Sequence, residues 1–465
     1  MKTQTLILAS VGAFSVTGCV SLAPDYQRGE LPVPADLPVE TPSAATTDPL
    51  LWNQVVVSDA LRQVIDTALE ENRDLRAVAA NVRAARANLL VSRSALWPTF
   101  GATGSVQAGD TFDEGATGQQ TFADSTFAQV GVTTWELDFF GRTQNLNEAA
   151  LQAYLATAEG ERAAKIALAG TVAESWMQLA ADRELLGLAN RTAESQTESL
   201  SLTRELFDAG TASELDVRRA SASVAQAQAQ AAQYEAAVRR DVNALQQLVG
   251  TTLPASLLEQ AGLYPSPVAI DLPVGQSSEV LLERPDVRAA EARLIASNAN
   301  IGAARAAYFP SISLTGGVGV ASAELSDLFE GDGTSGWTVG PSINLPIFDF
   351  GRRRGNLEAA RAEADAALAT YQGTVQLAFR EVADAIAVSE TIDRRLTALD
   401  QLTEDTRVTF ELSGERFRSG LDGYLTVLDA QREYYNAQQQ LILASLDRDL
   451  NSVALYKALG TWTED

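Results

Sequence analysis

Four residues near the C-terminal end place acidic, hydroxyl and apolar side chains at the spacing of one helix face. Asp422, Leu425, Thr426 and Asp429 occupy positions i, i+3, i+4 and i+7, which lie on the same face of a helix. Rings of carboxylates around a pore attract cations, and apolar rings exclude water. If several copies of this face surrounded one axis, each of these residues would form a ring of identical side chains.

A second stretch, beginning at Leu206, carries a related set of side chains. Leu215, Asp216 and Arg219 take the equivalent places, and Arg219 stands where the C-terminal stretch has Asp429. Opposite charges at equivalent positions predict ion pairs between neighbouring hairpins. The alternative is that these charges are solvated helix ends, where an ion pair contributes little.

Glycines precede both sets of residues and mark where the chain turns. Gly210 and Gly420 are predicted to adopt positive φ at the end of a helix, and Gly423 follows in the second turn. No proline occurs from Arg142 to Phe207 or from Arg352 to Phe417. An uninterrupted helix of that size is about 100 Å long, which suits a coiled coil or a hollow cylinder.

Composition excludes several classes of function. The 465 residues include 60 acidic and 35 basic side chains, a net charge of −25, which argues against a nucleic-acid partner. There is no histidine, so histidine-based triads, general bases and most catalytic zinc sites are excluded. No nucleophile–base pair or metal-ligand cluster stands out. We therefore expect neither an enzyme nor a metal site.

The N-terminus predicts export. Residues 1–18 hold an apolar run, Leu6–Val16, that is too short to span a membrane and is typical of a signal peptide. The run leads to Cys19, the only cysteine, in a context that resembles the bacterial lipobox. That resemblance implies N-acyl and S-diacylglycerol groups on Cys19, and Val20 after it fits sorting to the outer membrane. An ordinary signal peptide with an incidental cysteine is the alternative.

The rest of the chain is duplicated. Asp74, Arg93 and Pro98 recur 212 residues later, as Asp286, Arg305 and Pro310. Farther along the offset is 210, since Phe140-Gly141-Arg142 recurs as Phe350-Gly351-Arg352 and Gly210 as Gly420. We expect two structural repeats, 51–262 and 263–465, after a proline-rich tether at 19–50.

Each repeat reads as helix, two strands, long helix, hairpin tip, helix. The expected strands are about 99–109 and 126–138 in the first repeat and about 311–321 and 336–348 in the second, with tips near 207–214 and 417–424. Each strand nears the ~9–11 residues that a tilted membrane strand needs. Aromatic residues at the strand ends fit an interfacial girdle or ordinary core packing. They are Trp97, Phe100, Trp135, Phe139, Phe140, Phe309, Trp337, Phe348 and Phe350.

Four strands cannot close into a barrel, and an open sheet edge is not tolerated in lipid. If the strands cross a membrane, several protomers must therefore pool them, and three protomers would supply twelve strands.

The lipobox, the early segment LAPDYQR, the duplicated junctions and the motif SGLDGYLTVLDAQREYYNAQQQL together resemble outer-membrane efflux factors of the TolC type. The lipoprotein branch that includes OprM and NodT is the most similar. This resemblance implies a mostly α fold with a β-barrel portion: a homotrimer with a twelve-stranded barrel and a twelve-helix periplasmic tunnel. It also implies an exit duct in the outer membrane that conducts drugs, toxic compounds or metals, with a periplasmic adaptor and an inner-membrane pump, usually of the RND class. The alternatives are a type I protein secretion channel and, from a different class, a surface coiled-coil lipoprotein.

The resemblance also implies roles for individual residues. The pore-constricting apolar residue and acid of the family correspond to Leu425 and Asp429. TolC ties its hairpins with an aromatic hydroxyl and an arginine, whereas this chain has Phe417 and Asp422 there. That latch is therefore not expected here, and Arg418 or Arg219 are the candidates to replace it.

Overall fold

The computed structural model describes residues 20–38, 52–107, 125–269, 277–322, 326, 330 and 333–459. The expected signal peptide, Cys19 and much of the expected tether lie outside these residues. Among the helices described, none is both long enough and apolar enough to cross a membrane.

The chain forms two compact units, and neither coincides with a sequence repeat. The strand unit comprises Met1–Gly29, Val82–Thr157 and Ala290–Tyr371. The helical unit comprises Glu30–Asn81, Ala158–Ala289 and Gln372–Asp465. Each unit therefore takes matching segments from both repeats, because equivalent segments of the two repeats pack beside each other.

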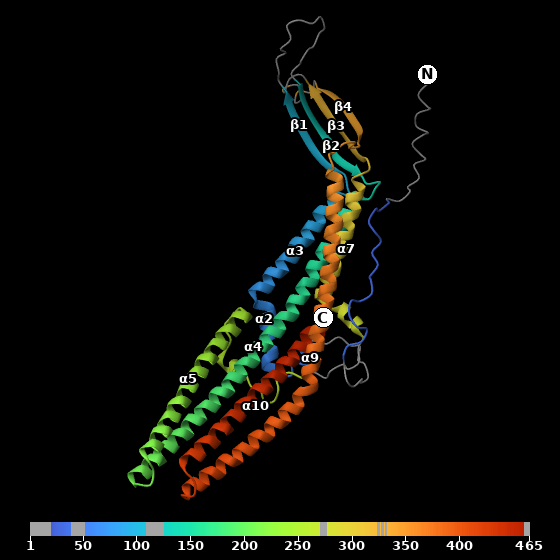
Figure 1. Ribbon diagram of the computed structural model, residues 1–465. Coiled ribbons are helices and arrows are strands. Elements are labelled where there is room, and N and C mark those ends of the chain that lie inside the picture. The colour runs from blue at the N-terminus through green and yellow to red at the C-terminus, as the bar shows by residue number, and fades with distance from the viewer. Residues whose placement is uncertain are drawn as a thin grey trace, which may run out of the picture. The chain divides into compact units, whose positions relative to one another are not determined.

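The strand unit contains one antiparallel sheet with the order β1-β2-β3-β4 (Figure 1). Its strands are β1 (Thr99–Gln107), β2 (Ser125–Leu137), β3 (Ser311–Ser322) and β4 (Thr334–Asn344). The sequence analysis placed the end of the last strand near residue 348, but β4 ends at Asn344. The central pair, β2 with β3, joins the two repeats.

Two very long helices run from the strands to the hairpin tips. They are α4 (Arg142–Asp208) and α9 (Arg352–Arg418), each of 67 residues. After a turn the chain returns as α5 (Glu214–Val249) or α10 (Tyr424–Leu459), each of 36 residues (Figure 1). The other helices are α1 (Trp52–Val55), α2 (Asp59–Glu71), α3 (Arg73–Ser94), α6 (Ala255–Leu258), the 3-10 helix η1 (Ser278–Glu283) and α7 (Pro285–Ala306).

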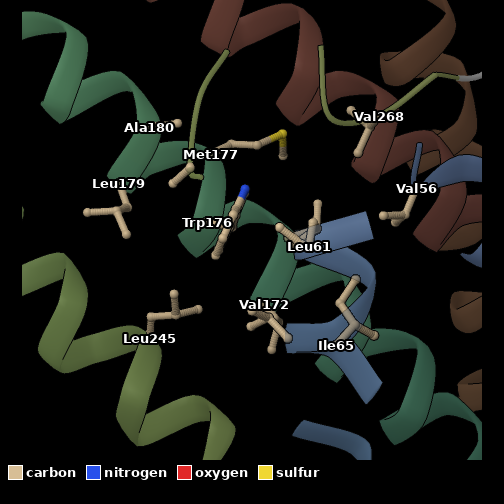
Figure 2. Close-up of a cluster of buried hydrophobic side chains, with 14 of the residues drawn as sticks. Val56, Leu61, Ile65, Val172, Trp176, Met177, Leu179, Ala180, Leu245 and Val268 are labelled. Carbon is tan, nitrogen blue, oxygen red and sulfur yellow. The ribbon is translucent and has the colours of Figure 1, made fainter. Parts of the chain in front are cut away.

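The main core of the helical unit gathers around Trp176 on α4. Leu61 and Ile65 from α2 and Leu245 from α5 are, like Trp176 and Met177, almost inaccessible to solvent. Figure 2 shows these side chains within one cluster. Burial of such large apolar side chains contributes about 1.5–3 kcal/mol each, so this cluster holds the long helix against its neighbours.

A buried arginine adds a polar cross-link to the helical unit. Arg284 is only 8% exposed in its side chain. Its guanidinium donates to the Ala458 carbonyl of α10 at 2.8 Å, to both carboxylate oxygens of Asp286 at 3.0 and 2.8 Å, and to Glu381 of α9 at 2.8 Å. Burial alone would raise the pKa of Asp286, but the hydrogen bonds from Arg284 lower it below its ordinary value. Arg284 thus joins three segments that are distant in sequence.

The segment after Cys19 packs on the strand unit, although the sequence analysis expected a tether there. Tyr26 donates to Glu291 at 2.8 Å, and Arg28 makes two hydrogen bonds to the same carboxylate at 2.8 and 2.7 Å. Arg305 donates to the Leu22 carbonyl at 2.9 Å. This part of the segment is therefore held to α7 by specific contacts.

Candidate functional site: the helical hairpin tips

The first tip is built by local hydrogen bonds. Gly210 has φ +78°, as predicted for a residue that ends a helix, and its N–H donates to the Phe207 carbonyl at 2.8 Å. Ser213 caps α5 by accepting from the Asp216 N–H at 3.3 Å, while the Asp216 carboxylate accepts from the Ser213 N–H at 3.1 Å. This reciprocal pair is a capping box. Asp216 therefore stabilises the start of its own helix.

The second tip uses an ion pair instead of a capping box. Gly420 has φ +71°, and Gly423 follows it within the turn. Arg416 donates to the two carboxylate oxygens of Asp422 at 2.6 and 3.1 Å. These hydrogen bonds lower the pKa of Asp422. The sequence analysis had not singled out Arg416, because its partner lies across the turn.

Leu425 and Asp429 lie on the outer face of α10. Leu425 is 45% exposed and the side chain of Asp429 is 61% exposed. An ion pair of 3.7 Å joins Asp429 to Arg432 on the same helix. The adjoining face carries Tyr424 and Leu428, both buried. The predicted constriction residues are thus free of the hairpin core and available to line a passage.

The structure does not bring the other predicted charges together within the chain's described residues. Leu215 is exposed and Arg219 is half-buried on α5. Within the part of the chain that the structure describes, Arg219 makes no ion pair with Asp429, and Arg418 makes no ion pair either. Pairing of Arg219 between hairpins of different copies stays a prediction, as does the latch role of Arg418 or Arg219.

A small apolar cluster joins the two hairpins just above their tips. Its buried members come from α4, α5 and α10: Leu200, Ala220, Val224, Tyr424 and Leu428. Phe417 packs against the Tyr424 ring at a centroid distance of 5.7 Å. Burial raises the pKa of Tyr424. At this level the two hairpins are held together by packing.

Buried amide side chains continue this contact along the helices. Gln196 of α4 donates to Gln431 of α10 at 2.7 Å, and Gln431 donates to Ser195 at 3.2 Å. A cavity of about 180 Å³ adjoins the pair. Its lining residues are Thr192, Gln196, Ser223, Gln226, Ala227, Gln230, Leu428, Gln431, Arg432, Tyr435 and Asn436. The sequence signal for these buried amides was Gln431, which lies on the face of α10 that also carries Leu428 and Tyr435.

Farther from the tips, two carboxyl groups meet between α4 and α5. Asp182 is buried and accepts from Gln178 at 3.3 Å. Asp241 lies close enough to Asp182 for a hydrogen bond between the two carboxyl groups. Burial, that hydrogen bond and the charge of Asp182 raise the pKa of Asp241 to about 7, against an opposing effect of Arg240. The pair therefore holds a proton at mildly acidic pH.

This proton predicts how stability depends on pH. Because the pKa of Asp241 is raised in the folded state, ionising it destabilises the fold progressively as pH rises from about 4 to about 7. Asp241→Asn removes that charge. We expect the variant to match the parent near pH 4 and to unfold at a higher temperature at pH 8. Circular dichroism melts across this range test it, with Asp400→Asn, at an exposed acid of α9, as the control. An equal gain in both variants would contradict the shared-proton pair.

Comparison with known proteins places this architecture. The family model for outer membrane efflux proteins matches residues 64–251 and 277–461. The chain is 42% identical over 457 residues to the solvent efflux pump outer membrane protein SrpC of Pseudomonas putida. This alignment covers 96% of each of the two chains. It is 39% identical to the outer membrane protein OprJ of Pseudomonas aeruginosa over 96% of this chain and 94% of OprJ.

Solved structures agree. The open state of the MtrE outer membrane channel of Neisseria gonorrhoeae matches with a TM-score of 0.85 at 34% identity, covering 95% of this chain and 98% of MtrE. A membrane protein from Pseudomonas aeruginosa matches with a TM-score of 0.87 at 39% identity, covering 95% and 100%. These matches confirm the TolC-type fold inferred from the duplicated motifs, and the chain belongs to the outer membrane efflux protein family.

Proposed function

We propose that this protein is the outer-membrane exit duct of a tripartite efflux system. The observation that carries the proposal is the match to efflux-pump outer membrane proteins over almost the whole chain. The role is transport and not catalysis, in keeping with a family of channels. The duct passes cargo from the periplasm to the exterior and is joined by an adaptor and an inner-membrane pump.

The duct is a homotrimer in this proposal. Each chain has a four-stranded sheet whose outer strands, β1 and β4, each pair on one side among the described residues. Three such sheets supply the twelve strands of a closed barrel, which removes every open edge. The paired hairpins of three chains supply the helices of the twelve-helix tunnel.

The cargo is a small toxic molecule. Similar proteins are named for the efflux of solvent, toluene and antibiotic. Efflux is therefore favoured over protein secretion, since none of these names refers to a secreted protein. The pump is proposed to be of the RND class.

Cys19 is proposed to carry the N-acyl and S-diacylglycerol lipid. Support comes from the lipobox pattern, and residues soon after it, Leu22 and Arg28, are held by hydrogen bonds to Arg305 and Glu291. The lipid then assists attachment to the membrane that the strands cross.

The hairpin tips are proposed to close the duct until the adaptor separates them. Leu425 and Asp429 form the constriction, and Asp422, Arg418, Leu215, Asp216 and Arg219 surround it. The exposed position of Leu425 and Asp429, on a helix face that the hairpin core leaves uncovered, supports this assignment.

Reconstitution tests the function. We expect the purified protein to run as a heat-resistant trimer in detergent and to conduct ions in planar bilayers. In cells lacking their own exit duct, co-expression with a matching adaptor and pump is expected to restore solvent and antibiotic tolerance. A folded protein that conducts no ions and restores no tolerance would overturn the proposal, and restored export of a protein substrate would assign it to secretion.

A further inference from the structure

An apolar segment after β4 is left exposed by the part of the chain that the structure describes. Phe350 is fully exposed (103%), and Ile347 and Phe348 are 79% and 88% exposed. Phe350 also has φ +53°, the only positive φ of a non-glycine residue among those described. An aromatic residue in that backbone region is strained. The surrounding structure must compensate for both the strain and the exposure.

The internal repeat shows what such a residue contacts. Phe140 is the equivalent of Phe350, and it stacks on Phe309 with ring centroids 4.6 Å apart and an angle of 17° between the rings. The equivalent of Phe309 in the first repeat is Trp97, which is 72% exposed. The chain therefore makes one of two equivalent aromatic contacts and leaves both halves of the other exposed.

The strand register establishes these equivalences independently. Thr99 pairs with Thr134 in the first repeat, and Ser311 pairs with Asn344 in the second. The first members differ by 212 positions and the second members by 210, which are the offsets read from the sequence. The first pairs at the two hairpin bases are thus equivalent. Beyond them the registers differ by one residue, because Phe100 pairs with Val132 whereas its equivalent Ile312 pairs with Ile343.

The same offsets apply to the pairing between repeats. At the base of β2, Leu137 pairs with Ile312 of β3. The equivalent of Leu137 is Ile347, which lies beyond the end of β4 and is exposed. The equivalent of Ile312 is Phe100, which is on β1 and is 73% exposed. The end of the second repeat therefore lacks the strand neighbour that the end of the first repeat has.

We propose that a second copy of this chain supplies that neighbour, with Phe350 stacked on Trp97 of the next copy and Ile347 opposite Phe100 of the next copy. This interface repeats, between chains, the contacts that Phe140 and Leu137 make within one chain. It is head-to-tail, the kind of interface that closes a ring when the rotation between copies returns to the first one, as it does in the proposed homotrimer. The inference rests on the proposed homotrimer and specifies the register in which its sheets join.

The interface accounts for the features of the isolated chain. Pairing extends the strand beyond Asn344 and covers the open edges of β1 and β4. Stacking against Trp97 removes apolar ring surface from solvent and adds the favourable geometry of an aromatic pair. The strained backbone of Phe350 is then held by the neighbouring copy.

Disulfide cross-linking tests the register. Ile347→Cys with Phe100→Cys is expected to give covalent oligomers up to the closed ring after oxidation, because directly opposed residues meet disulfide geometry. Leu137→Cys with Ile312→Cys, the matched pair within one chain, is expected to cross-link without changing the mass. Ile347→Cys with Ala102→Cys lies two residues out of register and should cross-link poorly.

The outcomes separate the inference from the proposed function. Oligomers measured by light scattering, together with equal or better cross-linking of the out-of-register pair, would overturn the register and leave the oligomer intact. A protein that conducts ions and assembles but forms no cross-linked oligomer with Ile347→Cys and Phe100→Cys would overturn the register as well. A folded protein that never assembles would overturn both.

Single substitutions test the aromatic contact. Phe350→Ala and Trp97→Ala are each expected to lower the temperature at which the oligomer dissociates in detergent. Because the two rings contact each other, the double variant should dissociate at about the same temperature as the less stable single variant. Phe348→Ala is the control, because its equivalent is Asp138 and it has no aromatic counterpart in the first repeat. An equal loss for Phe348→Ala would assign both rings to general contact with lipid or detergent.

Discussion

Replacing Leu425 and Asp429 together with alanine is expected to raise single-channel conductance several-fold in planar bilayers. In a closed ring of tips, Leu425 narrows the passage and repels water, and Asp429 concentrates cations there. Removing both side chains widens the constriction and weakens the preference for cations. The measurement is the conductance and the reversal potential in a salt gradient.

The structure makes this experiment interpretable. Leu425 and Asp429 are exposed on α10, so their loss creates no cavity in the hairpin core. Leu443→Ala, at an exposed leucine 18 residues farther along the same helix, is the control and should leave the conductance unchanged. Asp429→Asn alone should reduce the cation preference with little change in pore width. Unchanged conductance and unchanged selectivity in the double variant would exclude these residues as the constriction.

Arg284→Met is expected to be the most destabilising of the single substitutions considered, by about 3 kcal/mol, because it breaks a buried charge network. The substitution keeps an unbranched apolar stem but leaves Asp286, Glu381 and the Ala458 carbonyl without their shared donor. Unfolding by urea, followed by circular dichroism, measures the loss of free energy.

Arg288 provides a matched control for that variant. It also pairs with an acid, Glu283, but its side chain is 42% exposed. Exposed ion pairs contribute under about 1 kcal/mol, so Arg288→Met should be nearly neutral. If both variants lose the same stability, burial of Arg284 is not the source of its effect.

Much of the fold could be predicted because it depends on local interactions and on repetition. The proline-free stretches that end near Gly210 and Gly420 predicted α4 and α9 almost to the residue, because proline interrupts a helix and glycine often ends one. Gly210 and Gly420 were predicted as turns because few other residues adopt positive φ without strain. The end of β4 was predicted four residues too late, since a strand needs a neighbour to pair with and its sequence alone does not show where that neighbour ends.

The contacts at the candidate site depend on the tertiary structure instead. The pairs Arg416–Asp422, Gln196–Gln431 and Asp182–Asp241 each join residues across a turn or between helices. Which side chains meet there depends on how each helix is rotated about its axis and on how far it is shifted along its neighbour. Neither quantity is encoded in the spacing within one helix.

The amino-acid sequence by itself therefore determined the duplication, the long helices, the turns and the family, because each follows from local chemistry or from a recurring motif. Only the tertiary structure decided that matching halves of the two repeats form two compact units. It also showed that Leu425 and Asp429 face away from the hairpin core and that Phe350 lacks the stacking partner of Phe140. The physical reason is that burial and pairing are properties of segments brought together by folding, and a side chain's partner is known only when both segments are in place.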